Sequence, residues 1–259
     1  MVRKHERHER ILQELKARPT VRILELAGEF GVTTETVRRD VDELSKKGLV
    51  DRTYGGAAVT PLGSEPKIDA RATVFKEERT RIAKHALRLV AGDDVLMIDA
   101  GSTTTEFAAR LAASIPDTAQ TGATVITNCI NVARVLGPAK SVRTILCPGD
   151  FTDHEAAVFG SATLDYLRQF HANTAIIGAN GVSTRGVSDV VTGGSWVKRT
   201  MIERVDRVIL LADQRKFGVN EIAVVCGLDS INDLVTDDVP PPALSDGLSD
   251  AGVTVHVAK

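Results

Sequence analysis

The sequence from Thr33 to Ala57, TTETVRRDVDELSKKGLVDRTYGGA, contains the pattern of a helix and then that of a hairpin. Val37, Val41 and Leu44 recur at helical spacing and make one apolar seam. Thr33 suits the N-cap position, because its hydroxyl accepts a hydrogen bond from a backbone N–H of the first turn. The Gly-Gly pair near the end of the stretch favours a tight turn between two short strands. We therefore predict a helix followed by a short hairpin.

Two further helices are predicted before this segment. Residues 8–17 place apolar side chains on one face, and Pro19 ends that helix because the residue before a proline is pushed out of the α region. Residues 23–30 form a second short helix, and Gly31 supplies the turn after it. The order helix, helix, glycine turn, helix and Gly-Gly hairpin is that of a winged helix-turn-helix. We assign this domain to residues 1–59.

The third helix has the features of a recognition helix. Its apolar seam leaves the polar residues of the first two turns pointing away from the core, which is how such a helix faces a DNA groove. Basic residues cluster around the helix and the hairpin, and cations placed against phosphates gain affinity from counterion release. The expected DNA-binding residues are Arg22, Thr33, Thr34, Glu35, Thr36, Arg38, Arg39, Lys46, Arg52 and Tyr54.

A solvated helix face is the alternative interpretation of the two arginines. Glu35 can pair with Arg39, and Asp42 with Arg38, each pair contributing roughly a few tenths of a kcal/mol. The first 60 residues contain 12 Lys and Arg against 10 Asp and Glu, so gross charge does not identify a nucleic-acid partner. The clustering of the cations around one helix and one hairpin favours DNA binding.

The motif Thr-x-x-Thr-Val-Arg-Arg-Asp-Val at 33–41, followed by Gly48-Leu49 and by Arg52-x-x-Gly55-Gly56-Ala57, resembles the signature of the DeoR family of bacterial transcriptional regulators. The resemblance covers nearly the whole chain. It implies that the first domain binds operator DNA and that the second senses a phosphorylated sugar or a related metabolite. It also implies a homo-oligomeric repressor of a sugar catabolic or transport operon, released from spaced DNA half-sites by its effector.

The bulk properties limit the possible functions. The chain has 259 residues, which is long enough for two domains. Its net charge of −2 gives no polyanion-binding character overall. No apolar run approaches the ~18 residues that cross a membrane, and the charged start has no signal-peptide pattern. We expect a cytoplasmic protein with no membrane partner. The cysteines lack metal-ligand spacing, so we expect no metal and no cofactor, with His154 between two acids the one alternative left open.

A linker is predicted over residues 60–72, where apolar periodicity lapses and turn formers collect. Residues 73–259 alternate apolar strands with helices, which favours an α/β fold with a parallel sheet covered on both faces. Pro240-Pro241-Pro242 predicts a stiff connection before the last strand. The predicted strands are 95–98, 124–126, 142–146, 175–177, 208–211 and 253–257, and the predicted helices are 75–90, 104–113, 131–136, 161–170 and 195–205.

Ligands of such sheets bind beyond the carboxyl ends of the strands. The first strand end, Asp99-Ala100-Gly101-Ser102-Thr103-Thr104-Thr105, runs directly into a helix whose N–H groups and hydroxyls suit a phosphate. It has neither the lysine of a Walker loop nor the three glycines of a dinucleotide fingerprint. An ordinary tight turn favours the same residues, so the loop alone does not predict a phosphate site. Polar groups at the other strand ends support that prediction. The expected effector-binding residues are Asp99, Gly101, Ser102, Thr103, Thr104, Thr105, Asn128, Gly149, Asn180, Asp189, Lys198 and Lys216.

The segment Lys198-Arg199-Thr200-Met201-Ile202 resembles the lysine-bearing segment of the family. One of its cations is expected to neutralise a phosphate or to hydrogen-bond sugar hydroxyls. The alternative is a surface charge that pairs with Glu203 or Asp206. Many relatives carry an acid one turn before this lysine, whereas this chain has Gly193-Gly194. That departure puts hydroxyl recognition at this corner in question and leaves room for an effector other than the commoner hexose phosphates.

The second domain also resembles the ribose-5-phosphate isomerase fold, which supplies a rival hypothesis of an isomerase-like enzyme with an accessory DNA-binding domain. An aldose–ketose isomerase needs a carboxylate base near the carbons that exchange a proton. The segment Gly178-Ala179-Asn180-Gly181 has no carboxylate where the isomerases are rich in them, and Asp189 is the nearest remaining acid. We therefore expect a sensor without turnover. A module that recruits proteins and has no ligand is a third hypothesis, and it predicts no stabilisation by phosphorylated metabolites.

Overall fold

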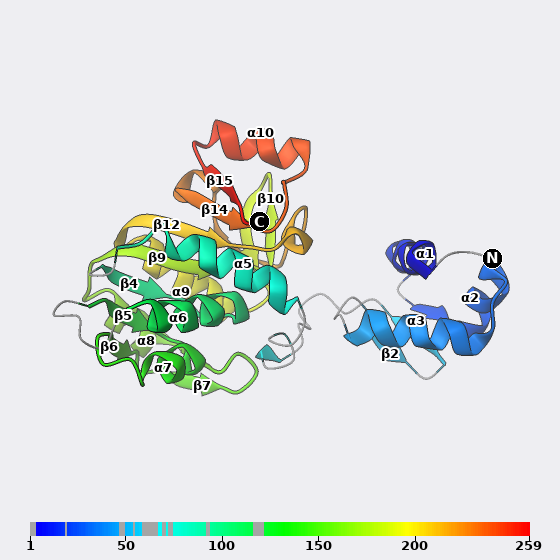
Figure 1. Cartoon of the computed structure of the whole chain (residues 1–259), viewed down its shortest axis with the longest axis horizontal. Coiled ribbons are helices and arrows are strands. Elements are labelled where there is room, and N and C mark those ends of the chain that lie inside the picture. The colour runs from blue at the N-terminus through cyan, green and yellow to red at the C-terminus, as the bar shows by residue number, and fades with distance from the viewer. Residues whose placement is uncertain are drawn as a thin grey trace. The chain divides into compact units, whose positions relative to one another are not determined.

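The computed structural model describes residues 4–18, 20–46, 50–53, 55–58, 67, 68, 71, 75–91, 94–115 and 122–259. The chain divides into two compact units, Met1–Pro66 and Lys67–Lys259 (Figure 1). Most of the predicted linker, Tyr54 and the side chain of Lys46 lie outside the described part. Within that part, no helix combines the length and the apolar character that a bilayer crossing requires.

The first unit is a winged helix-turn-helix, as predicted. Its small antiparallel sheet has the strand order β1-β3-β2. The first strand was not predicted, because three residues with one buried side chain give no periodic signal. In chain order the elements are α1 (Lys4–Ala17), β1 (Thr20–Arg22), α2 (Ile23–Phe30), α3 (Thr34–Lys46), β2 (Asp51–Thr53) and β3 (Gly56–Ala58).

The predicted apolar faces form the core of this unit. The turn before α3 has the predicted chemistry, since Gly31 has a left-handed φ of 62° and Thr33 Oγ1 accepts a hydrogen bond from Thr36 N at 3.3 Å. Both features hold α3 at a defined angle to α2. The buried side chains of the core include Ile11, Leu15, Leu26, Ala27, Phe30, Val37, Val41 and Leu44.

A buried ion pair connects the first and third helices. Arg7 Nε lies 2.6 Å from Asp40 Oδ2, and Arg7 Nη2 donates to Asp40 Oδ1 at 3.0 Å. Both side chains are buried, so the bidentate geometry fixes α3 against α1. The carboxylate raises the pKa of the Arg7 guanidinium, against the opposing effect of burial. The recognition helix is thus positioned by a polar contact between residues far apart in the sequence.

The second unit is built on a seven-stranded parallel sheet with the order β15-β14-β12-β9-β4-β5-β6. The α/β class with a parallel sheet is therefore confirmed. The strands are β4 (Val95–Ile98), β5 (Thr124–Thr127), β6 (Arg143–Leu146), β9 (Ala172–Gly178), β12 (Val205–Leu211), β14 (Asp233–Thr236) and β15 (Thr254–Val257).

Helices cover both faces of this sheet because alternate strand residues point in opposite directions. Leu96 and Ile98 of β4 pack with one set of helices, whereas Met97 between them packs with the other. The first set is α5 (Lys76–Leu87), α6 (Ser102–Ser114) and α7 (Ile130–Leu136), and the second is α8 (Ser161–Leu167), α9 (Thr192–Ile202) and α10 (Pro242–Asp250) (Figure 1).

Smaller elements lie in the connections between the strands of the large sheet. They comprise two antiparallel sheets and two short 3₁₀ helices. The first sheet pairs β10 (Gly181–Ser183), β11 (Gly186–Asp189) and β13 (Ala223–Cys226), and the second pairs β7 (Asp150–Thr152) with β8 (Ala157–Phe159). The 3₁₀ helices are η1 (Gln214–Lys216) and η2 (Leu228–Ser230).

Two predictions about elements were wrong. The helix expected over 195–205 begins at Thr192 and ends at Ile202, and Val205 already opens β12. Apolar residues continue across this boundary, so periodicity could not locate it. The connection expected at Pro240-Pro241-Pro242 leads into α10, because a proline suits the first turn of a helix, where its missing N–H is not needed.

Gly56→Ala should weaken the wing. A Cβ at residue 56 would lie 2.2 Å from the carbonyl oxygen of Val21, which is backbone and cannot move without breaking the β1–β3 pairing. We expect the free energy of unfolding to fall by about 1–3 kcal/mol. The measurement is hydrogen exchange of the amides of β1 and β3 in the full chain.

Gly28→Ala is the matched control for this substitution. A Cβ at residue 28, inside α2, would meet nothing within 4 Å. Alanine should therefore stabilise the helix by about 0.5–1 kcal/mol. Equal protection of the strand amides in both variants would contradict the assigned packing of the wing.

Candidate DNA-binding surface and effector site

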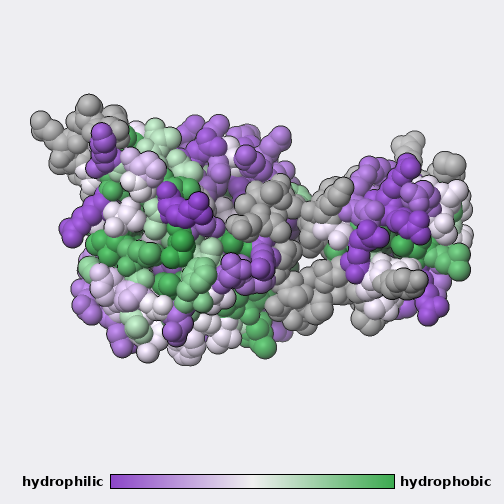
Figure 2. Space-filling view, turned by 90° about the horizontal axis from the view of Figure 1, so that it is seen from below, coloured by the Kyte–Doolittle hydropathy of each residue, from purple (hydrophilic) through white to green (hydrophobic). Residues whose placement is uncertain are grey.

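The predicted DNA-binding residues of α3 lie on one exposed side of the helix. Thr34, Glu35, Arg38 and Arg39 are exposed, while the apolar seam opposite them is buried. Arg22 and Arg52 in the adjoining strands are also exposed. Figure 2 shows strongly hydrophilic residues over much of the visible face of this smaller unit.

Three arginines of this surface, Arg38, Arg39 and Arg52, are paired with acids of the same unit. Arg38 Nη1 lies 2.8 Å from Glu35 Oε2, and Arg39 Nε lies 3.7 Å from the other oxygen of Glu35. The predicted pairing of Asp42 with Arg38 was wrong, because Asp42 contacts Arg52 of the wing at 3.0 Å. These pairs are exposed and contribute little stability, so a phosphate competes for the guanidinium groups at small cost.

The second site begins where β4 ends and α6 starts. Thr104 Oγ1 and Thr105 Oγ1 donate to the carbonyl oxygen of Gly101 at 3.0 and 2.7 Å, so two of the four predicted hydroxyls serve the turn itself. Ser102 and Thr103 are partly exposed. No side chain caps the first turn of α6. Its N–H groups and the positive end of the helix dipole therefore suit an anion.

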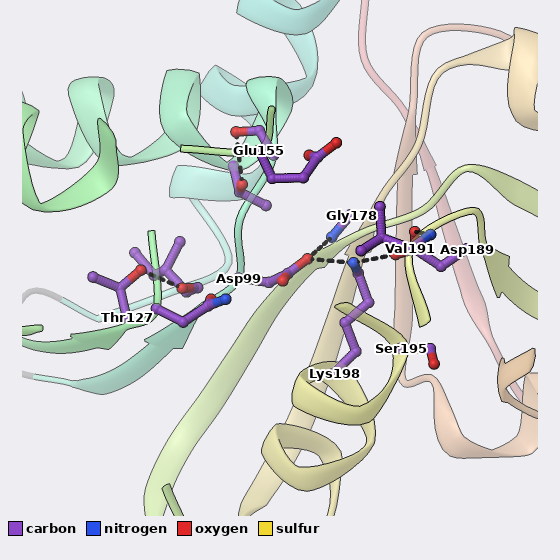
Figure 3. A network of polar contacts seen from close by, with 12 residues as sticks. Asp99, Thr127, Glu155, Gly178, Asp189, Val191, Ser195 and Lys198 are labelled. Atoms are coloured by element: carbon purple, nitrogen blue, oxygen red, sulfur yellow. Dashed lines mark hydrogen bonds and ion pairs between the residues drawn. The ribbon is translucent and has the colours of Figure 1, made fainter. Parts of the chain in front are cut away.

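A buried lysine lies beside this turn, between two carboxylates. Lys198 Nζ is 2.9 Å from Asp99 Oδ2 and 2.5 Å from Asp189 Oδ2 (Figure 3). Asp189 Oδ1 also accepts a hydrogen bond from the N–H of Val191, at 2.9 Å. The network joins β4, β11 and α9. All three residues were predicted separately as effector-binding positions, and the structure brings them together.

Burial and charge act in opposite directions on this network. Burial raises the pKa of Asp99 to about 6, although the nearby ammonium group of Lys198 acts to lower it. For Lys198, burial acts to lower the pKa, but the two carboxylates outweigh it and the pKa is raised. Lys198 therefore stays charged at neutral pH. The alternative of a surface charge paired with Glu203 or Asp206 was wrong.

The acid that partners the lysine comes from a different place than the family resemblance suggested. A Cβ at Gly194 would lie 3.4 Å from Asp189 Oδ2 and 3.7 Å from Lys198 Nζ. A longer side chain at position 194 would thus occupy the space next to the ion pair. In this chain Asp189 supplies the acid from β11, and Gly194 leaves the adjacent space open.

Two buried acceptor oxygens at this edge have no donor among the residues that the structure describes. They are Asp99 Oδ1 and Asn128 Oδ1. The amide nitrogen of Asn128 is used, since it donates to the carbonyl oxygen of Val158 at 3.1 Å. The two residues follow paired positions of neighbouring parallel strands, because Ile98 is in register with Thr127. A buried acceptor without a donor is costly, so this pair calls for a ligand that donates hydrogen bonds.

The other predicted effector residues have different surroundings. Gly149 packs closely, since a Cβ there would lie 2.2 Å from Thr163 Oγ1, which is a structural reason for its glycine. Asn180 follows β9, and its backbone N–H bonds to the carbonyl oxygen of Ser188. Lys216 ends η1, after β12. These residues follow strands that end on the same edge of the sheet: β9 is next to β4, whereas β6 and β12 are each one strand further away.

A small hollow borders the first turn of α6. Its walls include Ser102 and Thr105 of α6 and Lys76 and Arg79 of α5. Ile68, from the predicted linker, forms another part of the wall. Lys76, Arg79 and Ile68 were not predicted as site residues. The α5 segment showed only the apolar pattern of a helix that packs on the sheet, and the linker showed no pattern. The basic residues of α5, one turn apart, were the available signal.

The described residues contain no group of three His, Cys, Asp or Glu side chains placed to hold a metal ion. His154, the position left open, contacts Glu155 through Nδ1 at 3.0 Å. Cys129 and Cys147 are buried, and burial raises the pKa of the Cys147 thiol to about 12. These two cysteines behave as small apolar residues of the core.

A winged helix-turn-helix joined to a parallel α/β unit with a ligand-suited sheet edge defines a DNA-binding regulator with a sensor domain. Two family models match the chain: the DeoR-like helix-turn-helix domain over residues 7–61 and the DeoR C terminal sensor domain over residues 74–238. The chain belongs to the DeoR family of transcriptional regulators. This confirms the prediction of a regulator, and the enzyme hypothesis was wrong.

Several relatives match along almost their whole length. The chain is 30% identical to the glycerol-3-phosphate regulon repressor of Escherichia coli, over 97% of this chain and 98% of the relative. It is 30% identical to the HTH-type transcriptional repressor GlcR of Bacillus subtilis, over 96% of this chain and 94% of the relative. The putative aga operon transcriptional repressor of E. coli O157:H7 is 28% identical, over 96% and 92%.

Solved structures match the chain more distantly. Ribose 5-phosphate isomerase A from Methanocaldococcus jannaschii has 16% identity and a TM-score of 0.42, over 55% of this chain and 54% of that one. The eIF2B beta subunit from Chaetomium thermophilum has 16% identity and a TM-score of 0.46, over 84% and 60%.

Asp99→Asn should remove a pH dependence of stability. The pKa of Asp99 is raised from 3.8 to about 6, so the folded chain holds a proton that the unfolded chain has released between these pH values. Stability due to this group therefore falls as pH rises through that window, on the order of 1 kcal/mol or more. The free energy of unfolding in urea, measured from pH 4.5 to 7, should show this fall only with Asp99 present.

Asp165→Asn, at an exposed acid of α8, is the control. It should leave the pH profile of the wild type unchanged. A constant stability difference between wild type and Asp99→Asn over the whole range would contradict the raised pKa.

Proposed function

We propose that this protein represses an operon for the uptake or breakdown of a phosphorylated sugar or polyol, and that this metabolite releases it from operator DNA. The pair of donor-free acceptors, Asp99 Oδ1 and Asn128 Oδ1, beside the first turn of α6 carries the proposal. The α6 N-terminus suits the phosphate, and the acceptors suit hydroxyl groups of the same ligand. A phosphorylated polyol presents both groups.

The names of the relatives support this chemical class. One is a repressor of a glycerol-3-phosphate regulon, and another is a putative repressor of the aga operon. In the proposed site, the remaining predicted residues on the sheet edge, Gly149, Asn180 and Lys216, complete the surroundings of the ligand. Lys198 acts chiefly by holding Asp99 and Asp189 in place, because its charge is already balanced.

The DNA-binding part of the proposal assigns α3 to the major groove. Arg38 and Arg39 contact base edges or flanking phosphates, while Arg22 and Arg52 contact the backbone. Thr33, Thr34, Glu35, Thr36, Lys46 and Tyr54 complete the predicted surface. We propose a homo-oligomer whose paired heads bind spaced half-sites, acting in the cytoplasm, where operator DNA is found. Residues 60–72 serve as the linker between the domains 1–59 and 73–259.

The decisive experiment is fluorescence anisotropy of DNA from immediately upstream of the gene's own operon. The bound protein is titrated with glycerol 3-phosphate, hexose 6-phosphates, their unphosphorylated forms and inorganic phosphate. Release by one phosphorylated compound at a concentration where its unphosphorylated form has no effect supports the proposal. Tight binding that no compound changes would overturn the sensing role and leave the DNA-binding role intact.

Arg38→Ala and Arg39→Ala should each weaken operator binding by about 5- to 150-fold, the range expected when a base contact is lost. Ligand binding to the sensor domain should be unchanged, because both residues belong to the other unit. The measurement is anisotropy against operator and against unrelated DNA of equal length. Arg168→Ala, at an exposed arginine of α8, is the control. Wild-type affinity in both variants would remove these arginines from the DNA surface.

Thr103→Glu should give a protein that binds DNA but does not respond to the ligand. A carboxylate in the first turn of α6 is compatible with the helix dipole, and it repels a phosphate at the same place. Thr103→Gln, which has the same shape without the charge, should keep most of the response. Release of Thr103→Glu by the same ligand concentration as wild type would exclude the α6 turn from the site.

A further inference from the structure

The first residues after the DNA-binding unit are attached to the sensor unit. We call the described residues Lys67, Ile68 and Arg71 the strap. Lys67 Nζ lies 2.7 Å from Asp153 Oδ2, and the backbone N–H of Ile68 donates to the carbonyl oxygen of His154 at 3.0 Å. Each strap residue thus has a defined position on the sensor unit, directly after the boundary between the two units.

The strongest contact of the strap is the ion pair between Arg71 and Glu155. The side chains are only 15% and 8% exposed, whereas those of Lys67 and Asp153 are 64% and 76% exposed. Screening by water makes the exposed pair weak, so the buried pair dominates. Ile68 adds a fully buried apolar side chain, and Arg79 of α5 donates to the carbonyl oxygen of Arg71.

The strand that directly follows the turn holding the strap is hydrogen-bonded to the proposed effector site. This turn, Asp153–Ala156, lies between β7 and β8. The backbone N–H of Val158 donates to Asn128 O at 2.9 Å, and the amide of Asn128 donates back to Val158 O at 3.1 Å. Asn128 is also the residue whose side-chain oxygen, Oδ1, has no donor among the described residues. A ligand that bonds this oxygen therefore acts on the residue that positions β8.

The strap touches the site by a second route. Ile68 forms one wall of the hollow at the first turn of α6, together with Ser102 and Thr105. A ligand group that enters this hollow contacts the strap directly. Both routes end on the strap, which is joined to the DNA-binding unit by chain continuity.

We propose that the strap transmits effector binding to the DNA-binding unit, with the Glu155–Arg71 ion pair as its attachment point. This inference rests on the proposed function, since it describes how ligand binding at the same site affects the DNA-binding unit. Ligand bound beside Asn128 and the α6 turn changes the contacts between the strap and the sensor unit. The strap in turn sets the position of the chain that leads to the winged helix. Coupling of this kind requires that the ligand binds the two strap arrangements with different affinity.

Glu155→Gln tests the proposal, because it removes the charge and keeps the shape. The full-length variant should bind the releasing phosphorylated compound with the wild-type Kd within about twofold, as measured by calorimetry without DNA. The same compound should change the operator affinity of the variant by less than about twofold, whereas typical coupling factors predict a change of about 5- to 150-fold for the wild type.

Two further variants show whether the effect is specific. Asp153→Asn breaks only the exposed Lys67 pair and should reduce the response by less than about twofold. Asp165→Asn breaks an exposed pair of α8 away from the strap and should respond as wild type does. Thermal melting shows which variants are folded, and an unfolded Glu155→Gln is replaced by Arg71→Gln, which breaks the same ion pair from the other side.

The outcomes separate this inference from the function on which it rests. If wild-type protein is released and Glu155→Gln is released equally well, the strap is not the transmitter. If the variant loses ligand affinity as well, Glu155 belongs to the ligand site and the proposal is wrong. If no compound releases the wild-type protein, the proposed function fails, and the transmission fails with it.

Discussion

The charge of Lys198 in the interior of the sensor unit is the feature on which its functional edge depends. An isolated ammonium group there is very costly, and it is tolerated because two carboxylates surround it. Those carboxylates come from β4 of the large sheet and from β11 of a small one. The ion pairs therefore hold the small sheet and α9 at the end of β4, where the ligand-suited turn begins.

The same edge contains buried acceptor oxygens whose donors are not among the described residues. Burial raises the pKa of Asp99, and Asp189, the second carboxylate that shares the lysine, acts in the same direction. One oxygen of Asp99 and one of Asn128 still lack donors in the described part of the chain. In the proposed function, the hydroxyl groups of a phosphorylated polyol donate to these oxygens, which is the physical reason to expect selectivity for a polyol over a bare anion.

The DNA-binding unit also contains a buried ion pair that fixes the position of a functional element. The Arg7–Asp40 ion pair is buried between α1 and α3 and sets the direction of the recognition helix, while the exposed arginines of α3 are held only by weak surface pairs. Strong polar contacts thus occur where geometry must be constant. Weak ones occur where a partner has to displace them.

The sequence by itself determined the elements whose signals are local. The Val37, Val41 and Leu44 seam, the Thr33 cap and the Gly31 turn are contacts within a few residues, so they could be predicted together with the winged helix-turn-helix. The alternation of apolar strands with helices predicted the parallel sheet in the same way. Parallel strands place their carboxyl ends on one edge, and this predicted where site residues gather.

Only the tertiary structure decided which of those residues meet. Lys198 pairs with Asp99, 99 positions away, because β9 and β4 are neighbours in the sheet, and no local pattern contains that order. The partners Arg7 and Asp40, and Arg71 and Glu155, are likewise separated by many residues. Short strands such as β1 and the attachment of the strap were missed for the same reason: their stability comes from long-range contacts, which leave no periodic signal in the chain.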